Sequence, residues 1–449
     1  MAAFSFFMTG SVAVAKDDLA AKTYSLTNAA TNTLAVAQND SSAETQSDSS
    51  AITQDDSPAA TALEKKPLGL RLGPFDLHPR LSAGMIYDNN VLFSTNNKEA
   101  DADWMIQPAV QAVAGDDAAL IAYRDQNNTV LDLSPGSLII QEPEDRPGKL
   151  FILDYGPRFQ IFDKYSANNS IDEFATLDLL WPMDKLILGL KQDYQLEKMT
   201  IIEANQRTTV ETIPTTLSAA YQFDDKTSME SDFRRISIDY GSPGLTGYTE
   251  YNTEDWVNYE VAQKLNASLG VLAGWDVVAG HQDQTYEQLR VRARYNYTEK
   301  LTFDASVGGE LRQYENGSPE SLSPVFSIAG KYLLAERTWF QLNGYRQLYA
   351  AIFDGYNYAT TGVTLDAVQG ITDRFSVDLS VGFKAASYAA ISDPSTTHTD
   401  DYYTARIALN AKIVRHLNGQ IFGQWISRQS QFDGDLTDDQ AGVQLILSY

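Results

Sequence analysis

Three sequence patterns predict an all-β protein, folded as a transmembrane antiparallel up-and-down barrel of about 18 strands, with about 16 strands as the alternative. Apolar and polar residues alternate from Pro67 onward, so each strand has one apolar and one polar face. Short polar turns recur at nearly constant spacing, and aromatic residues cluster where strands end. A soluble β-sandwich would share the alternation, but it would not pair aromatic residues with the type of turn.

Two segments precede the predicted barrel. The first is an apolar stretch that ends in Ala13-Val14-Ala15, the small-x-small form of an export cleavage site, which predicts a signal peptide at 1–15 although no basic residues open it. Residues 16–66 are rich in Ala, Ser, Thr, Asp, Asn and Gln, without an aromatic residue after Tyr24. Such a composition cannot bury enough apolar surface to fold, so we predict a disordered periplasmic spacer.

The barrel itself is predicted over 67–449. It begins with a hairpin of strands at 78–87 and 103–114, followed by the proline-containing segment 115–148, interpreted as an insertion on the periplasmic side. Sixteen strands follow from Lys149 to the final strand at 439–449, and every second connection is short. These turns have first residues 36 to 42 positions apart, at Asp184-Lys185, Asp225-Lys226, Gln263-Lys264, Glu299-Lys300, Glu336-Arg337, Asp373-Arg374 and Arg415-His416.

Longer connections alternate with the short turns. They are rich in Asp, Asn, Gly, Ser and Thr and are predicted at 164–170, 197–208, 241–248, 279–284, 315–323, 350–357, 389–401 and 429–438. Short turns on one side and longer loops on the other are typical of an outer-membrane barrel, with the short turns in the periplasm. Strands of about 10–14 residues are long enough to cross a bilayer at a tilt.

Aromatic residues at both strand ends predict two girdles at the membrane interfaces. The first set lies beside the short turns and comprises Trp181, Tyr221, Phe223, Tyr295, Tyr297, Tyr332 and Trp339. The second set lies beside the long loops and comprises Tyr165, Tyr240, Tyr251, Tyr314, Tyr349, Tyr388 and Tyr403.

The last strand carries a further signal. One parity is apolar up to the terminal aromatic residue, through Ala441, Val443, Leu445, Leu447 and Tyr449. This pattern resembles the assembly signal of bacterial outer-membrane proteins, which implies recognition by the barrel-assembly machinery. An extended strand of this kind can be captured by addition to the edge of a partner sheet.

The segment 79–91 contains Gly84 followed by Tyr87-Asp88-Asn89-Asn90. With the hairpin repeats and charged turns, it resembles the type 2 family of bacterial β-barrel porins over about residues 70–449. The resemblance implies an outer-membrane barrel with a porin-like or export-related role, in some members linked to exopolysaccharide production. The segment 115–148 departs from the plain hairpin pattern.

Composition excludes several functions. The net charge of −25 argues against nucleic-acid binding, which needs a basic face. The absence of cysteine and the four scattered histidines give no metal-binding or thiol chemistry, so we assign no catalytic, cofactor or metal residues and expect no enzyme. An outer-membrane lipid hydrolase is the least favoured alternative, because no nucleophile motif accompanies His281 or His398.

The candidate site is a row of charges on the polar face of the strand at 288–297. Arg290, Arg292 and Arg294 alternate there, with about 7 Å between successive members. Pairing Tyr297 with Leu301 across the turn predicts a lumen ladder of Arg290, Arg292, Arg294, Asp304, Glu310 and Arg312, in which Arg294 faces Asp304.

Two interpretations of this ladder remain open. In the first, it faces acids elsewhere on the wall and sets pore selectivity through a transverse field, the candidate acids being Asp154, Asp178, Asp193 and Asp378. In the second, the arginines only brace neighbouring carboxylates.

The sequence thus predicts a porin-like channel in the outer membrane of a Gram-negative-type bacterium. It would pass small hydrophilic solutes or saccharides by diffusion or export. A non-conducting barrel that anchors an envelope or secretion complex is the alternative. Expected partners are outer-membrane lipids and lipopolysaccharide, the barrel-assembly machinery and small polar solutes, and a homo-oligomer is compatible with the pattern.

Overall fold

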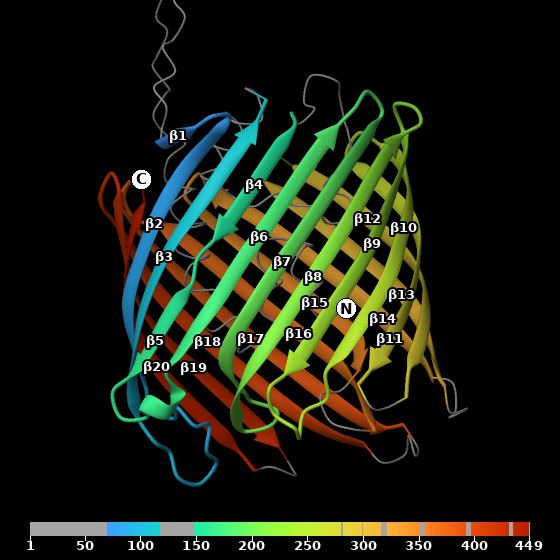
Figure 1. The fold of residues 1–449 in the computed structure, drawn as a ribbon. Coiled ribbons are helices and arrows are strands. Elements are labelled where there is room, and N and C mark those ends of the chain that lie inside the picture. Colours follow the sequence, from blue (N-terminus) through green and yellow to red (C-terminus); the bar gives the residue numbers. More distant parts are fainter. Residues whose placement is uncertain are drawn as a thin grey trace, which may run out of the picture.

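The chain forms one antiparallel sheet that closes on itself (Figure 1). The computed structural model describes residues 70–116, 148–279, 282–298, 300–315, 321–350, 355–391, 397–430 and 434–448. The predicted signal peptide, the spacer and Tyr449 lie outside the described residues, and so does the predicted insertion except for its two ends. Those ends meet beside the short turns, where the Asp116 amide donates to the Lys149 carbonyl at 2.9 Å.

The strands are long and steeply tilted in Figure 1. A 3₁₀ turn, η4 (Ser166–Asn168), lies between the fifth and sixth. The strands are β1 (Leu70–Leu72), β2 (Phe75–Asp88), β3 (Asp101–Gly115), β4 (Leu150–Tyr155), β5 (Arg158–Phe162), β6 (Ser170–Pro182), β7 (Leu186–Ile201), β8 (Gln206–Gln222), β9 (Thr227–Tyr240), β10 (Tyr248–Ala262), β11 (Leu265–Val278), β12 (Gln284–Thr298), β13 (Leu301–Tyr314), β14 (Ser321–Ala335), β15 (Thr338–Ala350), β16 (Tyr356–Gly370), β17 (Phe375–Ala390), β18 (Thr397–Val414), β19 (Leu417–Ser430) and β20 (Leu436–Ser448).

The 20 strands occupy 18 positions in the barrel wall. β1 is a short strand of three residues that pairs with β2. β4 and β5 share one position, because both pair with β3 on one side and β6 on the other. Their interruption falls at Gly156-Pro157, where the proline has no N–H to donate to a ladder. Strand β20 pairs with β2 and closes the barrel, which confirms the prediction of 18 strands.

The short turns join the strand pairs as predicted, and most of the predicted long loops fall between strands to within three residues, whereas those at 197–208 and 389–401 are wrong in extent. β7 runs to Ile201 and β8 begins at Gln206, so most of the predicted loop 197–208 is strand. In the same way, β17 ends at Ala390 and β18 begins at Thr397. Polar composition suggested loops there, but a closed ladder of backbone hydrogen bonds continues beyond the last apolar pair, because pairing satisfies the backbone whatever the side chains.

Several glycines inside the strands have a packing role. A Cβ built on Gly274 would lie 2.1 Å from Cζ of Tyr286, so only glycine lets that ring lie flat on the wall. The same contact between an inward-facing aromatic ring and a glycine on the paired strand recurs, in Trp256 with Gly270, Tyr345 with Gly362, and Phe422 with Gly442. These pairs explain glycine in strand interiors, where it otherwise weakens a sheet.

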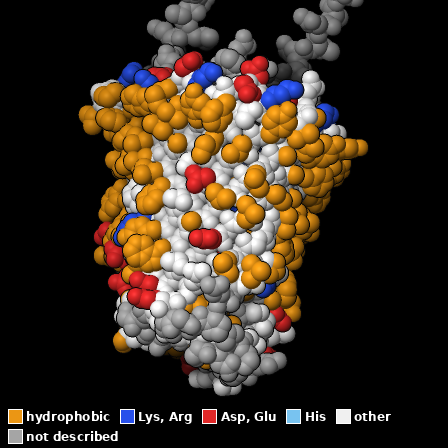
Figure 2. All heavy atoms as spheres, turned by 90° about the vertical axis from the view of Figure 1, so that its right-hand side faces the viewer, with side chains coloured by type: hydrophobic (Ala, Val, Ile, Leu, Met, Phe, Trp, Pro, Cys, Tyr) orange, Lys and Arg blue, Asp and Glu red, His pale blue; other side chains and the backbone are white. Residues whose placement is uncertain are grey.

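The outer face carries the apolar parity of the strands. Figure 2 shows apolar side chains over large areas of one side of the barrel. Leu289 and Ile421 are 60% and 61% exposed, although both are large and apolar. Among the described residues, no helix is long and apolar enough to span a bilayer.

The girdle beside the short turns is largely as predicted, since Trp181, Tyr221, Phe223, Tyr295, Tyr297 and Tyr332 are exposed. Trp339 is the exception: it has the other parity, and Phe340 faces outward beside it.

The girdle beside the loops is partly wrong. Tyr349 and Tyr388 point into the barrel and are 2% exposed, and Tyr240 and Tyr314 also have the inward parity of their strands. Trp104, Trp275 and Trp425 are exposed on the outside instead. Sequence parity is ambiguous there, because the inner face also becomes apolar at this end.

Candidate functional site inside the barrel

The predicted ladder lies on the inner face of β12 and β13, in the register expected from the sequence. Arg294 pairs with Asp304, Arg292 with Ser306, and Gln288 with Glu310. The turn differs in detail, because Thr298 rather than Tyr297 pairs with Leu301, and a bulge between Asn296 and Thr298 absorbs the difference. The predicted ladder residues therefore lie side by side on the wall.

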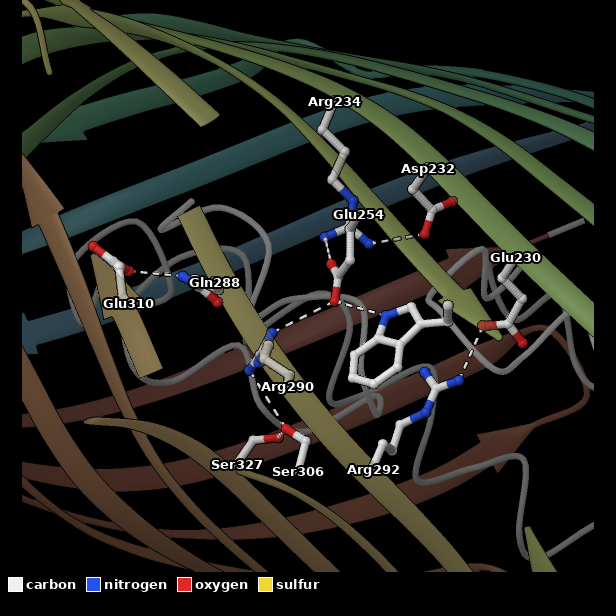
Figure 3. Close-up of polar contacts among 11 residues, drawn as sticks. Glu230, Asp232, Arg234, Glu254, Gln288, Arg290, Arg292, Ser306, Glu310 and Ser327 are labelled. Atoms are coloured by element: carbon white, nitrogen blue, oxygen red, sulfur yellow. Dashed lines mark hydrogen bonds and ion pairs between the residues drawn. The ribbon is translucent and has the colours of Figure 1, made fainter. Parts of the chain in front are cut away.

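Glu254 on β10 links two arginines of the wall (Figure 3). Its Oε2 accepts a hydrogen bond from Nη1 of Arg234 at 3.0 Å, and Nη1 of Arg290 lies 3.5 Å from its Oε1. The indole Nε1 of Trp256 donates to the same Oε1 at 3.0 Å. Arg234 also contacts Asp232 at 3.2 Å. Arg290 is thus held by a carboxylate two strands away, within a network whose charged side chains are largely buried.

Arg292 crosses a longer stretch of wall. Its Nη2 lies 3.1 Å from Oε2 of Glu230 on β9 and donates to Oδ1 of Asn258 at 2.7 Å. Its guanidinium stacks 4.2 Å from the centre of the Trp256 ring, a favourable arrangement for a cation over an aromatic face. Because β9 and β12 are three strand positions apart, the arginine lies along the inner surface of the barrel.

Arg312 has the most complete set of partners. Its Nε donates to Oε1 of Glu310 at 2.7 Å, and its Nη1 donates to Oδ2 of Asp276 at 2.9 Å. The Tyr286 ring lies 4.6 Å from its guanidinium carbon. Its side chain is 1% exposed, and those of Glu310 and Asp276 are 0% and 2% exposed. Buried charges of this kind are stable only when they are paired and hydrogen-bonded.

Arg294 is the most accessible member of the ladder. Its Nε donates to Oδ2 of Asp304 at 3.1 Å, and the two side chains are 32% and 23% exposed. It lies nearest the short turn of β12 and β13.

Besides Asp304 and Glu310, the ladder arginines are compensated by acids that the sequence did not single out. These partners are Glu230 on β9, Glu254 on β10 and Asp276 on β11. The proposed partner acids lie elsewhere: Asp154 accepts from Arg80, Asp193 from Thr176, and Asp378 from Asn410, while Asp178 pairs in register with Lys191. Charged residues alternate along the inward-facing positions of β9 and β10, and this alternation was the signal in the sequence for these partner acids.

The loop end of the barrel is bridged from one wall to the other. The tip that joins β7 to β8, residues 202–205, reaches the opposite wall, where Nη1 of Arg428 donates to the Ile202 carbonyl at 2.6 Å. Nζ of Lys384 lies 3.6 Å from Oε1 of Glu203. Counting β2 as the first barrel position and β4 and β5 as one, β8 is sixth and β17 fifteenth of 18, so the contact spans the barrel.

An apolar cluster surrounds this tip, which we call the loop-end cluster. It combines residues from both walls and three loops, including Phe93, Ile202, Ile236, Leu245, Tyr388, Tyr402, Ile426 and Leu436. The rings of Tyr388 and His398 stack 4.6 Å apart, and Tyr358 stacks on Tyr388 at 5.4 Å. In the part of the chain that the structure describes, the loop end of the barrel interior is therefore filled by side chains of opposite walls.

The segment that carries the family resemblance has a structural role here. Oδ1 of Asp88 accepts the Asn90 amide at 2.7 Å, and the Asn90 side chain donates to the carbonyls of Ser94 and Thr437. These contacts fold the loop after β2 back onto β20. No group of His, Asp and Glu residues within the described ranges is arranged to hold a metal ion.

The closing strand β20 presents its predicted signal on the outside. Val443, Leu445 and Leu447 are exposed there, and they alternate with inward residues such as Gln444. The strand pairs with β19 along its length and with β2 at the seam.

Comparisons with known proteins give a likeness of fold. No family model matches the chain, and no curated protein matches it. It is similar to OccAB4 of Acinetobacter baumannii, with a TM-score of 0.44 and 10% identity over 83% of this chain and 98% of that one. It is also similar to the outer membrane channel DcaP of the same organism, with a TM-score of 0.42 and 11% identity over 85% of this chain and 99% of that one. A third similar structure is OccK2 (OpdF) of Pseudomonas aeruginosa in complex with glucuronate, with a TM-score of 0.45 and 9% identity over 83% of this chain and 98% of that one.

Proposed function

We propose that this barrel is an outer-membrane channel of a Gram-negative-type bacterium that passes small hydrophilic solutes or saccharides. The main support for this proposal is that the wall of the closed barrel has an apolar outer face and an inner face of polar and charged side chains. Such a wall suits a bilayer on one side and water or polar solutes on the other. Barrels of this strand number typically enclose an aqueous channel.

The contacts across the loop end narrow the barrel interior there. Opening would require the tip at 202–205 to leave Arg428 and Lys384 on the opposite wall. We propose that the tip acts as the gate of the channel. Loops and tips of this kind can move while the paired strands beneath them stay in place.

The test is single-channel recording of the purified barrel in planar bilayers, with and without Ile202→Ser combined with Glu203→Lys. The variant removes an apolar anchor and places a cation against Lys384 and Arg428, so we expect a larger conductance or a larger open fraction than in the original chain. Glu336→Lys, the same charge reversal at a short turn, is the matched control and should leave both unchanged. Absence of conductance in every form would overturn the proposed channel.

The charge ladder is proposed to set ion selectivity. Replacing Arg290, Arg292 and Arg294 by Ala leaves Glu230, Glu254 and Asp304 without these cations. We expect the reversal potential in a salt gradient to shift toward cation preference, because the wall then carries an excess of negative charge. The heat-dependent gel mobility of the folded barrel serves as a check of folding. Unchanged selectivity in a folded, conducting triple variant would contradict this role.

The alternative function is a non-conducting barrel that anchors an envelope or secretion complex. The loop-end cluster favours it, since apolar side chains from opposite walls meet there. The resemblance at 84–90 supports a link to exopolysaccharide export within the channel proposal. We further propose that Ala441, Val443, Leu445, Leu447 and Tyr449 are the signal read by the barrel-assembly machinery.

A further inference from the structure

One arc of the outer face carries several polar residues at a depth in the wall where the opposite arc is apolar. On β7 to β10, the polar outward-facing residues at this depth are Gln192, Thr215, Ser231, Thr253 and Asp255, which we call the polar arc, and the apolar Leu217 and Phe233 lie among them. At comparable distances from the short turns, the outward residues of β17 to β20 include Leu379, Val381, Ile407, Leu409 and Val443. Figure 2 shows acidic side chains in a pale zone between apolar flanks.

Asp255 lies within the apolar belt and not beyond its edge. It pairs in register with Val271, which is 52% exposed on the outer face. Val257 follows it toward the short turn, and Tyr251 precedes it toward the loops, with its ring 5.7 Å from that of Trp275. Because the Tyr251 and Trp275 rings mark the interface level, Asp255 and Thr253 belong to the region that would face lipid chains.

The polar arc is only partly satisfied by contacts along the wall. Oγ of Ser231 donates to Oδ1 of Asp255 at 2.6 Å, and Oγ1 of Thr215 donates to Oε1 of Gln192 at 2.6 Å. A carboxylate can accept further hydrogen bonds at its second oxygen, and lipid chains offer no donor. The exposed hydroxyl of Thr253, two residues away on the same strand, is a donor of the required kind.

We propose that the polar arc is the interface between two copies of this chain, related by a two-fold axis along the membrane normal. A two-fold axis brings the same patch of both copies together, so a patch must complement itself. The polar arc does so, because Thr253 of one copy can donate to Asp255 of the other. Hydrogen bonds between polar side chains are a recognised source of association in lipid. The proposal rests on membrane insertion, as in the proposed function, but not on conductance.

The absence of cysteine from the chain permits a direct test by single-cysteine cross-linking of the full chain in its outer membrane. Thr253→Cys is treated with an oxidant and examined on a non-reducing gel, and a disulfide-linked dimer is expected. The matched control is Ala405→Cys on β18, which faces outward on the opposite arc and lies equally far from its own short turn. It should stay monomeric. Adding Asp255→Leu to Thr253→Cys should lower the cross-linked fraction several-fold.

Three results would overturn the proposal. The first is a Thr253→Cys protein that folds, as shown by heat-dependent gel mobility, but stays monomeric. The second is equal cross-linking from both cysteine positions, which would indicate random collision. The third is a cross-linked product with a different protein. Dimer formation in a barrel that shows no conductance would leave the interface standing and remove the channel function alone.

Discussion

Replacing Arg312 by Met is expected to lower the free energy of unfolding of the barrel by about 3–5 kcal/mol, the range found when one partner of a buried ion pair is removed. Methionine keeps much of the side-chain length over the Tyr286 ring. It leaves the carboxylates of Glu310 and Asp276 buried without their main cation. The measurement is urea unfolding of the barrel refolded into lipid vesicles, followed by tryptophan fluorescence.

Two further variants isolate the cause. Arg294→Met removes the exposed pair with Asp304 and should cost only about 0–1 kcal/mol, because solvent screens such pairs. Adding Glu310→Gln and Asp276→Asn to Arg312→Met should recover part of the lost stability, since neutral amides are cheaper to bury than unpaired carboxylates. Equal losses for Arg312→Met and Arg294→Met would show that the buried network does not hold the wall together.

The architecture could be predicted because its rules are local. Alternation fixes which residues face outward, and a short turn fixes the register of the two strands that it joins. The pairing of Arg294 with Asp304 follows from these two rules alone, even though a bulge at Asn296 and Thr298 changes the turn itself. The extent of the loops at 197–208 and 389–401 could not be predicted, because polar strands that continue beyond an apolar belt resemble loops in composition.

The partners of the ladder on β9, β10 and β11 could not be predicted, because they depend on curvature. Arg292 contacts Glu230 three strand positions away, where the concave wall brings long side chains together. The contact of Arg428 with Ile202 spans 226 residues and the whole width of the barrel. Sequence patterns identify neighbours along a hairpin, but they contain no distance between opposite walls.

The outer face offers the second large effect. Val291→Arg on β12 is expected to lower the free energy of unfolding of the barrel in a bilayer by about 2–4 kcal/mol, the cost measured for arginine at the midplane of a barrel's lipid face. Val291 lies between Leu269 and Val307 on the neighbouring strands, and all three are more than half exposed. Nothing in this apolar row can pair with a guanidinium, so the new cation must distort the bilayer or draw water into it.

Thr285→Arg on the same strand provides the comparison. Thr285 also faces outward, but it is the second residue of β12 and pairs with Trp275 at the interface level. An arginine there can reach water and headgroups, and its cost should be about 0–1 kcal/mol. Urea unfolding of the barrel in lipid vesicles measures the cost of both substitutions. If the outer face met water instead of lipid, both substitutions would be nearly neutral, and Val291→Arg would improve solubility without detergent. The two positions lie on one strand and one face. A large difference in cost between Val291→Arg and Thr285→Arg would therefore show that Val291 lies deeper in the bilayer than Thr285.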